Sequence, residues 1–244
     1  MPRLLVFADS LSFHGPDGPC AADEPRLWLN VTAAELGGSA DLVAGIGWTA
    51  RDAWWSLTGD PRVWADLHHV DAVVFAVGSM DTLPSPLPTY LRTGLRYLRP
   101  DGLRRVVRKV YLAAQPRLAV ALRGRPVVLP VKLTVRYLDT AVHALRVLRP
   151  TLPIVGMLPS VHRADSYGHV HTARDGAAAA MAGWAARVDV PLLDLPAVVG
   201  EHVLSGRGNP DGMHWGWEGH ELVGKAMAEM LRPLLITGDE PGAS

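Results

Sequence analysis

Six short runs of apolar residues, rich in Val, Ile and Leu, recur along this chain of 244 residues. They occupy residues 3–8, 40–44, 71–77, 126–131, 152–157 and 190–194. The runs lack the alternation typical of a strand with one wet face, so they predict strands buried on both faces of a parallel sheet. Such a sheet needs a layer of helices on each side, which strongly limits the folds open to the chain.

Longer segments with helical spacing of apolar residues separate the predicted strands. They cover residues 25–36, 50–58, 87–99, 102–122, 138–148, 173–187 and 216–233. This alternation predicts a three-layer α/β/α sandwich with a mostly parallel central sheet. We expect a single domain over residues 1–244, with residues 237–244 as a loose tail.

The composition excludes several classes of protein. A single cysteine, Cys20, rules out an internal disulfide and a zinc site built from several cysteines, and it suits a reducing compartment. The apolar stretch at the N-terminus is too short for a signal peptide, and Asp9 ends it. No apolar run approaches the roughly 20 residues of a membrane span. We therefore expect a cytoplasmic protein without stable membrane insertion.

Basic residues gather in the middle of a chain whose formal net charge is zero. Residues 92–149 contain 14 Lys and Arg but only two acidic residues, Asp101 and Asp139. We interpret this stretch first as a solvated helical face. The alternative is a site for the phosphates of an acyl-coenzyme A. No nucleic-acid partner is expected, because the isoelectric point is near neutral and no reading motif is present.

Candidate site residues follow the predicted strands. Because ligands bind beyond the carboxyl ends of parallel strands, we expect these residues to meet at one edge of the sheet. They are Ser10, Gly47, Gly78, His162, Asp211 and His214. An imidazole can take the proton of a serine hydroxyl, and a carboxylate can hold that imidazole in the required tautomer. Asp211 and His214, three residues apart, can supply such a pair locally. The sequence therefore predicts a serine site with Ser10 as the nucleophile.

Four blocks of sequence, in order, resemble the motifs of the SGNH (GDSL-type) esterase and acyltransferase superfamily. They are Ala8-Asp9-Ser10-Leu11, Gly45-Ile46-Gly47-Trp48-Thr49, Gly78-Ser79-Met80-Asp81 and Asp211-Gly212-Met213-His214. The resemblance implies the SGNH, flavodoxin-like fold and a catalytic triad of Ser10, Asp211 and His214. It also implies an oxyanion hole made by the backbone N–H groups of Ser10 and Gly47, with Gly45 as the rival of Gly47. Met80 stands where the superfamily has an asparagine, so one side-chain donor is missing.

Further residues are expected to contact the substrate. They are Asp9, Trp48, Met80, Asp81, His162 and Trp215. Asp81 is expected to tie its loop by hydrogen bonds, and Trp48 or Trp215 to offer a flat face to a sugar, the alternative being core packing. The loop over residues 159–171 reads as a polar substrate-binding lid. His169 and His171 lack a clear carboxylate partner, so no metal is expected.

Together with Phe13-His14-Gly15 and the ending Asp211-Gly-Met-His-Trp-Gly216, the blocks resemble actinobacterial diglucosylglycerate octanoyltransferases. This resemblance implies transfer of an octanoyl group from octanoyl-coenzyme A to a glucose hydroxyl of diglucosylglycerate, a precursor of methylglucose lipopolysaccharide, through an acyl-Ser10 intermediate. The expected partners are this acyl donor and a glucoside acceptor, with acyl-coenzyme A as co-substrate and no other cofactor. Two alternatives stay open: an esterase or lipase that hydrolyses short acyl or acetyl esters of carbohydrates, and a non-catalytic sugar-binding module. The oligomeric state is also open.

Overall fold

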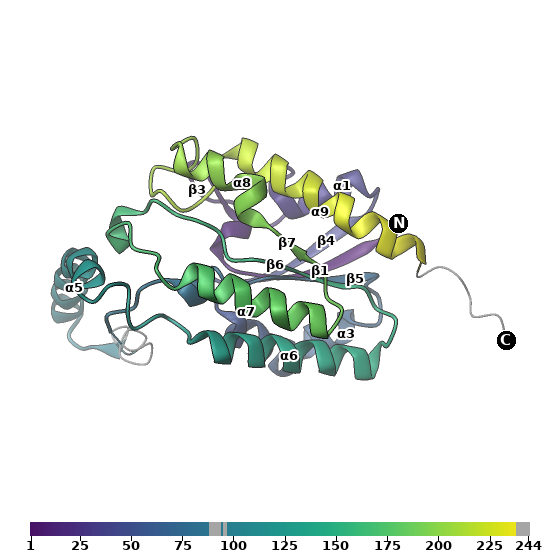
Figure 1. The fold of residues 1–244 in the computed structure, drawn as a ribbon, viewed down its shortest axis with the longest axis horizontal. Coiled ribbons are helices and arrows are strands. Elements are labelled where there is room, and N and C mark those ends of the chain that lie inside the picture. The colour runs from purple at the N-terminus through teal and green to yellow at the C-terminus, as the bar shows by residue number, and fades with distance from the viewer. Residues whose placement is uncertain (88–93, 95–96, 238–244) are drawn as a thin grey trace.

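The computed structural model describes residues 1–87, 94 and 97–237, and a five-stranded parallel sheet lies at its centre (Figure 1). The strand order is β4-β1-β5-β6-β7. The strands are β1 (Arg3–Ala8), β4 (Ser39–Ala44), β5 (Ala72–Ala76), β6 (Ile154–Met157) and β7 (Leu192–Leu193). Every residue of β1 after Arg3 is buried, as predicted for strands covered on both faces, whereas β4 at the edge of the sheet is only partly buried, contrary to that prediction.

Five of the six predicted strands form, each within a few residues of its expected bounds. The sixth prediction, residues 126–131, is wrong. Pro126 and Pro130 have no N–H to give to a sheet, and the place beside β5 belongs to β6. The segment instead pairs with the loop after β5, where Val128 N–H donates to Leu83 O and Leu129 N–H donates to Asp81 O.

Helices cover both faces of the sheet, as predicted (Figure 1). Leu4 and Val6 of β1 pack towards α1 (Trp28–Glu35), α8 (Leu195–Leu204) and α9 (Trp217–Thr237). Leu5 and Phe7 point the other way, towards α2 (Ala50–Gly59), α3 (Pro61–Asp66), α6 (Val131–Leu148) and α7 (Arg174–Arg187). Alternate side chains of one strand therefore anchor both helical layers.

The helix predictions differ from the structure mostly at element ends. Helix α1 begins three residues later than expected, and α6 begins at Val131 rather than at 138, directly after Pro130. Helix α5 (Asp101–Ala121) matches its predicted range, 102–122, to within a residue. Most of the predicted helix 87–99 lies outside the described residues, as do residues 238–244 of the predicted tail, while Thr237 ends α9.

Two helices, α3 and α8, were not predicted. Each begins after an aspartate whose side chain accepts a backbone N–H of the first turn, Asp60 from Arg62 and Asp194 from Ala197. Each also has a proline in that turn. This combination of an Asp cap and an early Pro is a sequence signal that indicates a helix start.

The register of the three strands β4, β1 and β5 places their last residues side by side. Ala8 pairs with Ala44 on one side and with Ala76 on the other. The segments that follow, which begin at Asp9, Gly45 and Val77, therefore leave the sheet at the same edge. A two-stranded hairpin, β2 (His14–Gly15) with β3 (Gly18–Pro19), follows shortly after β1. No helix in the described part of the chain is long and apolar enough to cross a membrane.

The Phe7 side chain should contribute strongly to stability, because it is fully buried and stacks on Phe75 at a centroid distance of 5.3 Å. We expect Phe7→Ala to lower the free energy of unfolding by about 3–5 kcal/mol in urea titrations. The control Ile46→Ala, at a side chain that is 76% exposed, should change it by less than about 0.5 kcal/mol. Equal effects of the two substitutions would contradict this view of the core.

Candidate active site

Ser10 lies where β1 passes into a short 3-10 helix, Ser10–Ser12. Asp9 caps this turn, because its carboxylate accepts the N–H of Leu11 at 2.9 Å. The cap directs the chain sharply away from the strand and leaves the Ser10 side chain at the carboxyl edge of the sheet. The Ser10 residue is only 5% exposed.

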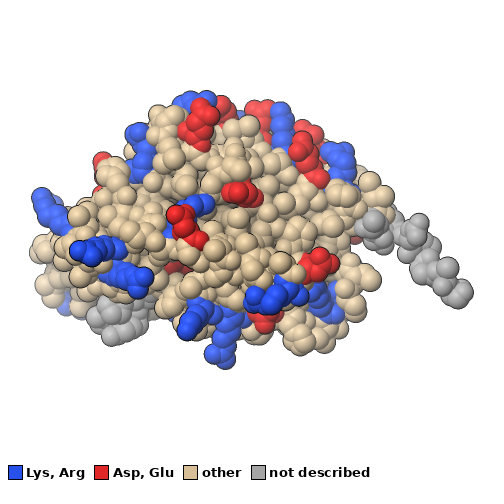
Figure 2. Space-filling model, in the orientation of Figure 1, with Lys and Arg blue, Asp and Glu red and all other residues tan. Residues whose placement is uncertain are grey.

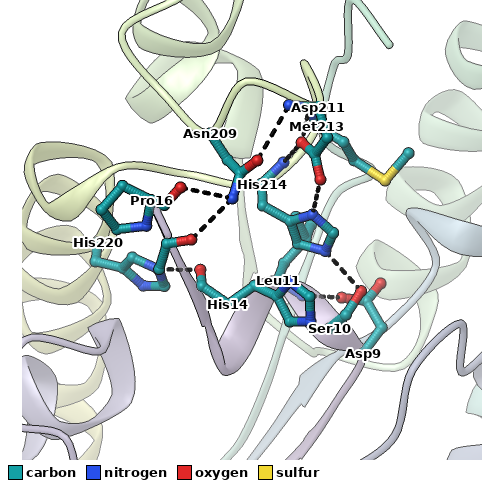
Figure 3. A network of polar contacts seen from close by, with 11 residues as sticks. Asp9, Ser10, Leu11, His14, Pro16, Asn209, Asp211, Met213, His214 and His220 are labelled. Carbon is teal, nitrogen blue, oxygen red and sulfur yellow. Dashed lines mark hydrogen bonds and ion pairs between the residues drawn. The ribbon is translucent and has the colours of Figure 1, made fainter. Parts of the chain in front are cut away.

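Ser10, His214 and Asp211 form a continuous chain of hydrogen bonds (Figure 3). His214 Nε2 lies 2.9 Å from Ser10 Oγ, and His214 Nδ1 lies 2.5 Å from Asp211 Oδ2. Because a carboxylate only accepts, Nδ1 carries the proton and Nε2 is left to accept the proton of the serine hydroxyl. The arrangement has the geometry in which an imidazole can remove that proton.

The Asp211 carboxylate is held in its charged form. Burial raises the pKa of Asp211, but hydrogen bonds from the His214 ring and from the backbone amides of His214 and Met213 outweigh burial, and the pKa is about 2. A permanent negative charge beside Nδ1 stabilises an imidazolium whenever His214 gains a proton.

Asn209 joins the His214 loop to the segment after Ser10, a role that the sequence analysis missed. Its side-chain amide donates to the carbonyls of Gly15 and Pro16 at 3.0 and 2.9 Å. Its side-chain oxygen accepts the N–H of Asp211, and its backbone N–H donates to His214 O (Figure 3). The amide NH2 group thus holds together two segments nearly 200 residues apart in sequence, while the side-chain oxygen fixes the loop that carries Asp211.

His14 packs against the ring of His214. Its ring stacks on that of His214, with centroids 4.2 Å apart and an angle of 23° between the rings. Burial and the neighbouring His214 lower the pKa of His14, which favours a neutral ring. The His14 backbone carbonyl accepts from His220 of α9 at 2.9 Å, and His220 also accepts the N–H of Trp28. The hairpin after Ser10 is therefore fixed to the last helix.

A pocket opens beside Ser10, and its walls are mixed in character. The apolar lining residues are Leu11, Met80, Leu83, Val161 and Met213. The polar ones, besides Asp9 and Ser10, are Ser79, Ser160, His162 and His171. No lysine or arginine is among the described residues that line this pocket. The basic stretch of the sequence therefore does not contribute to this part of the site.

Two histidines of the predicted lid reach the pocket as a pair. The rings of His162 and His171 lie 4.3 Å apart. Thr82 donates its hydroxyl proton to Ser79 O, so it accepts from His171 Nε2 at 2.8 Å. Burial lowers the pKa of His162 to about 4 and that of His171 to about 3, so both rings are neutral at neutral pH. His162 was predicted at the site, whereas His171 was considered only for a metal.

The described residues offer no metal centre. His169 pairs with Asp165 at 3.0 Å, away from His171, whose Nε2 is engaged by Thr82. No group of three or more His, Cys, Asp or Glu side chains within residues 1–87, 94 and 97–237 is placed to hold a metal ion.

Gly47 and Met80 face each other, and Met80 lines the pocket beside Ser10. Gly47 has a positive φ of 71°, a conformation that favours glycine. The Met80 methyl carbon lies 3.6 Å from the point that a Cβ on Gly47 would take. In the motif that Gly78-Ser79-Met80-Asp81 resembles, an asparagine stands at the position of Met80, whose thioether donates no hydrogen bond. Gly45 is the alternative to Gly47 as an oxyanion donor. Its position requires glycine, because a side chain there would collide with the Trp48 indole.

Neither tryptophan of the predicted substrate set lies in the Ser10 pocket. The Trp215 residue is 1% exposed and belongs to the core under α1 and α9, so it offers no face to a sugar and this prediction is wrong. Trp48 packs on Gly45 and lines a separate groove along the outer strand β4. The sequence pattern marked both residues because they adjoin the motifs, but adjacent side chains of a chain often point in different directions.

Two carboxyl groups, Asp9 in the pocket wall and Asp81 in the loop after β5, are buried. Burial raises the pKa of Asp9 to about 6 and that of Asp81 to about 7. Asp81 accepts from Thr134 Oγ1 at 2.7 Å and from the N–H of Ala50 at 3.3 Å. It thereby ties the loop after β5 to both α6 and α2. These hydrogen bonds agree with the role predicted for Asp81.

Asn209→Asp should slow the reaction of Ser10 with a serine-directed phosphonate by about 100-fold, since a small misplacement of the base has effects of this size. The new carboxylate cannot donate to Gly15 and Pro16. The matched control is Asn30→Asp, because Asn30 also donates to two backbone carbonyls, Ala22 O and Glu24 O, but far from the site. Similar labelling rates for both variants, with similar melting temperatures, would refute this role for Asn209.

Asp81→Asn should flatten the dependence of stability on pH. The folded state raises the pKa of Asp81 from 3.8 to about 7, so the folded protein binds the proton more tightly than the unfolded chain does. This contribution to stability is present below pH 4 and is lost as the pH rises to 7, by about 1.4 kcal/mol per pKa unit. Urea unfolding between pH 4 and pH 8 should show a smaller decline for the variant, and an unchanged slope would contradict the assignment.

Comparison with known proteins places the chain in a family. No protein-family model matches it. It is 50% identical over 230 residues to the diglucosylglycerate octanoyltransferase of Mycolicibacterium hassiacum, covering 94% of this chain and 95% of the relative. The enzyme of the same name from Mycobacterium tuberculosis is also 50% identical, with coverage of 94% and 92%.

Solved structures agree on the fold. A lipase/acylhydrolase from Enterococcus faecalis superposes with a TM-score of 0.62 at 14% identity and covers 96% of both chains. A lipolytic protein of the G-D-S-L family from Desulfitobacterium hafniense gives 0.60 at 15% identity, over 95% of this chain and all of the other. The chain therefore belongs to the diglucosylglycerate octanoyltransferase family, built on the fold of the SGNH (GDSL-type) hydrolases.

Proposed function

We propose that this protein is a serine acyltransferase that moves an octanoyl group from octanoyl-coenzyme A to a glucose hydroxyl of diglucosylglycerate, in the pathway to methylglucose lipopolysaccharide. The observation that carries the proposal is the 2.9 Å contact between His214 Nε2 and Ser10 Oγ, in a chain half identical to octanoyltransferases. The proposal includes no resident cofactor. The chain has a single cysteine, Cys20, so it forms no internal disulfide, which supports a cytoplasmic location.

In the first step His214 accepts the proton of Ser10 as the serine oxygen bonds to the thioester carbonyl carbon. Asp211 stabilises the imidazolium that results. When the tetrahedral intermediate collapses, the carbon–sulfur bond breaks and His214 gives its proton to the departing thiolate. Free coenzyme A and an octanoyl ester of Ser10 remain, so atoms and protons balance.

In the second step a glucose hydroxyl replaces the thiol. His214 takes the hydroxyl proton while the sugar oxygen attacks the ester carbonyl, and it returns that proton to the Ser10 oxygen as the bond to serine breaks. Water in place of the sugar would make the same site an esterase. The choice of product therefore depends on which acceptor occupies the site and on how well water is kept out.

The walls of the pocket suit the proposed acyl donor. Leu11, Leu83 and Met213 offer apolar surface to a hydrocarbon chain beside the nucleophile. Backbone amides of Ser10 and Gly47 are the proposed oxyanion donors, each of a kind worth about 2.7–4 kcal/mol in other enzymes. With Met80 in place of an asparagine the hole has fewer donors, which suits an activated thioester better than an amide.

Brief mixing with octanoyl-coenzyme A should increase the mass of the protein by about 126 Da, the mass of an octanoyl group that replaces one hydrogen. Peptide mapping should place the group on Ser10. Ser10→Ala should abolish the adduct and lower turnover by at least about 10³-fold. Ser12→Ala is the matched control, because Ser12 is buried nearby but its hydroxyl bonds to the Trp28 indole. An adduct retained in Ser10→Ala would refute the mechanism.

The rate of coenzyme A release separates the candidate functions. A transferase should release it much faster when diglucosylglycerate is present, and the octanoyl group should appear on the sugar. An esterase should hydrolyse simple octanoyl esters equally well without the sugar. A non-catalytic binding module should bind the glucoside with unchanged affinity after Ser10→Ala and should release no coenzyme A.

A further inference from the structure

Helix α5 has the most unusual surface of the described part of the chain. It projects at one end of the molecule, apart from the two helical layers (Figure 1). Of its residues, only Gln115 and Ala119 are buried, and the 3-10 turn Asp165–Tyr167 packs against it. A helix in this position normally presents polar side chains to water.

Large apolar side chains of α5 are instead exposed. Leu103 is 48% exposed, Val106 59% and Val110 63%. The spacing of three and then four residues places these side chains along one stripe of the helix. A contiguous apolar surface of this kind marks a site of contact with another partner.

Basic side chains run beside the apolar stripe. Arg105, Arg108 and Lys109 are exposed. Around the helix, Lys109 lies about 60° and Arg105 about 100° from Val106, so these two border the stripe, whereas Arg108 points to the opposite side of α5. Asp101 is the single acidic residue of α5, and it pairs with Arg104 at 3.2 Å. In Figure 2 the Lys and Arg side chains gather at the end of the molecule where α5 lies. The face therefore combines apolar surface with positive charge.

We propose that α5 binds the surface of an anionic lipid bilayer. A helix with a basic stripe beside an apolar stripe lies in the plane of the headgroups, with its apolar side chains at the boundary of the acyl chains. A second copy of the chain is a poorer partner. The segment Arg92–Arg149 carries 14 basic residues against two acidic ones, so two such faces would repel each other. Anionic lipids supply the complementary charge.

The test is sedimentation of the full-length protein with phosphatidylcholine vesicles, with and without phosphatidylglycerol. We expect binding to the anionic vesicles alone, and its loss at high salt. Arg105→Gln/Arg108→Gln/Lys109→Gln should weaken partitioning by at least roughly 30-fold, because Arg105 and Lys109 border the apolar stripe. Val106→Ser/Val110→Ser should weaken it by about tenfold. Release of coenzyme A in solution should be unchanged in both variants, because neither touches the Ser10 pocket.

Matched controls remove the same charge and the same apolar groups elsewhere. Arg187→Gln/Lys225→Gln/Arg232→Gln changes the net charge equally, on α7 and α9. Val147→Ser/Leu204→Ser removes two exposed apolar side chains from α6 and α8. Both controls should partition like the unmodified protein. Equal losses in a control and in its α5 counterpart would overturn the proposal.

Three other results would also overturn it. The first is the absence of sedimentation with anionic vesicles. The second is a dimer that Val106→Ser/Val110→Ser converts to a monomer, which would assign the face to a second copy. The third is a higher KM for octanoyl-coenzyme A in the Arg105/Arg108/Lys109 variant with unchanged sedimentation, which would assign these cations to the phosphates of the donor.

Discussion

The register of the parallel strands determines where everything else in the site lies. Ala8 stands between Ala44 and Ala76, so the loops after three strands leave the sheet at one level. The loop after β1 carries Ser10, and the pocket forms between it and its neighbours. A slip of one residue would turn each side chain of β1 to the opposite helical layer. The buried packing of Leu5 and Phe7 against one layer and of Leu4 and Val6 against the other prevents such a slip.

The fold and the hydrogen-bonded arrangement of Ser10, His214 and Asp211 could be predicted because local patterns encode them. Continuous apolar runs mark buried strands, and Asp211 lies close enough to His214 in sequence to bond it within one loop. Residues 126–131 fit the same apolar pattern yet form no strand, because β6 takes the place beside β5. Competition for a place in a sheet is a property of the whole fold, so no single segment reveals its outcome. Trp215 illustrates the same limit, since its neighbour His214 faces the site while Trp215 faces the core.

The residues that hold Ser10, His214 and Asp211 in place were harder to predict than these three residues themselves. Asn209 acts on carbonyl groups of Gly15 and Pro16, which any residue type could provide, so the sequence carries no mark of the partner. His14 stacks on His214 because the hairpin β2–β3 turns its ring towards the site. Residue propensities do not predict the direction in which such a short hairpin turns. Asn209 did carry one signal, its position two residues before Asp211, which is typical of a turn closed by an asparagine side chain.

Two contacts connect the N-terminal segment of the chain to its C-terminal segment. His220 donates to the His14 carbonyl, and Asn209 donates to the Pro16 carbonyl. A ribosome delivers these partners at opposite ends of translation. While the final helix is still in the exit tunnel, the nascent chain holds a serine with no base beside it. Such long loops also close slowly, because their ends must find each other across most of the chain. The contact between Ser10 and His214 can therefore form only after the last part of the chain has left the ribosome.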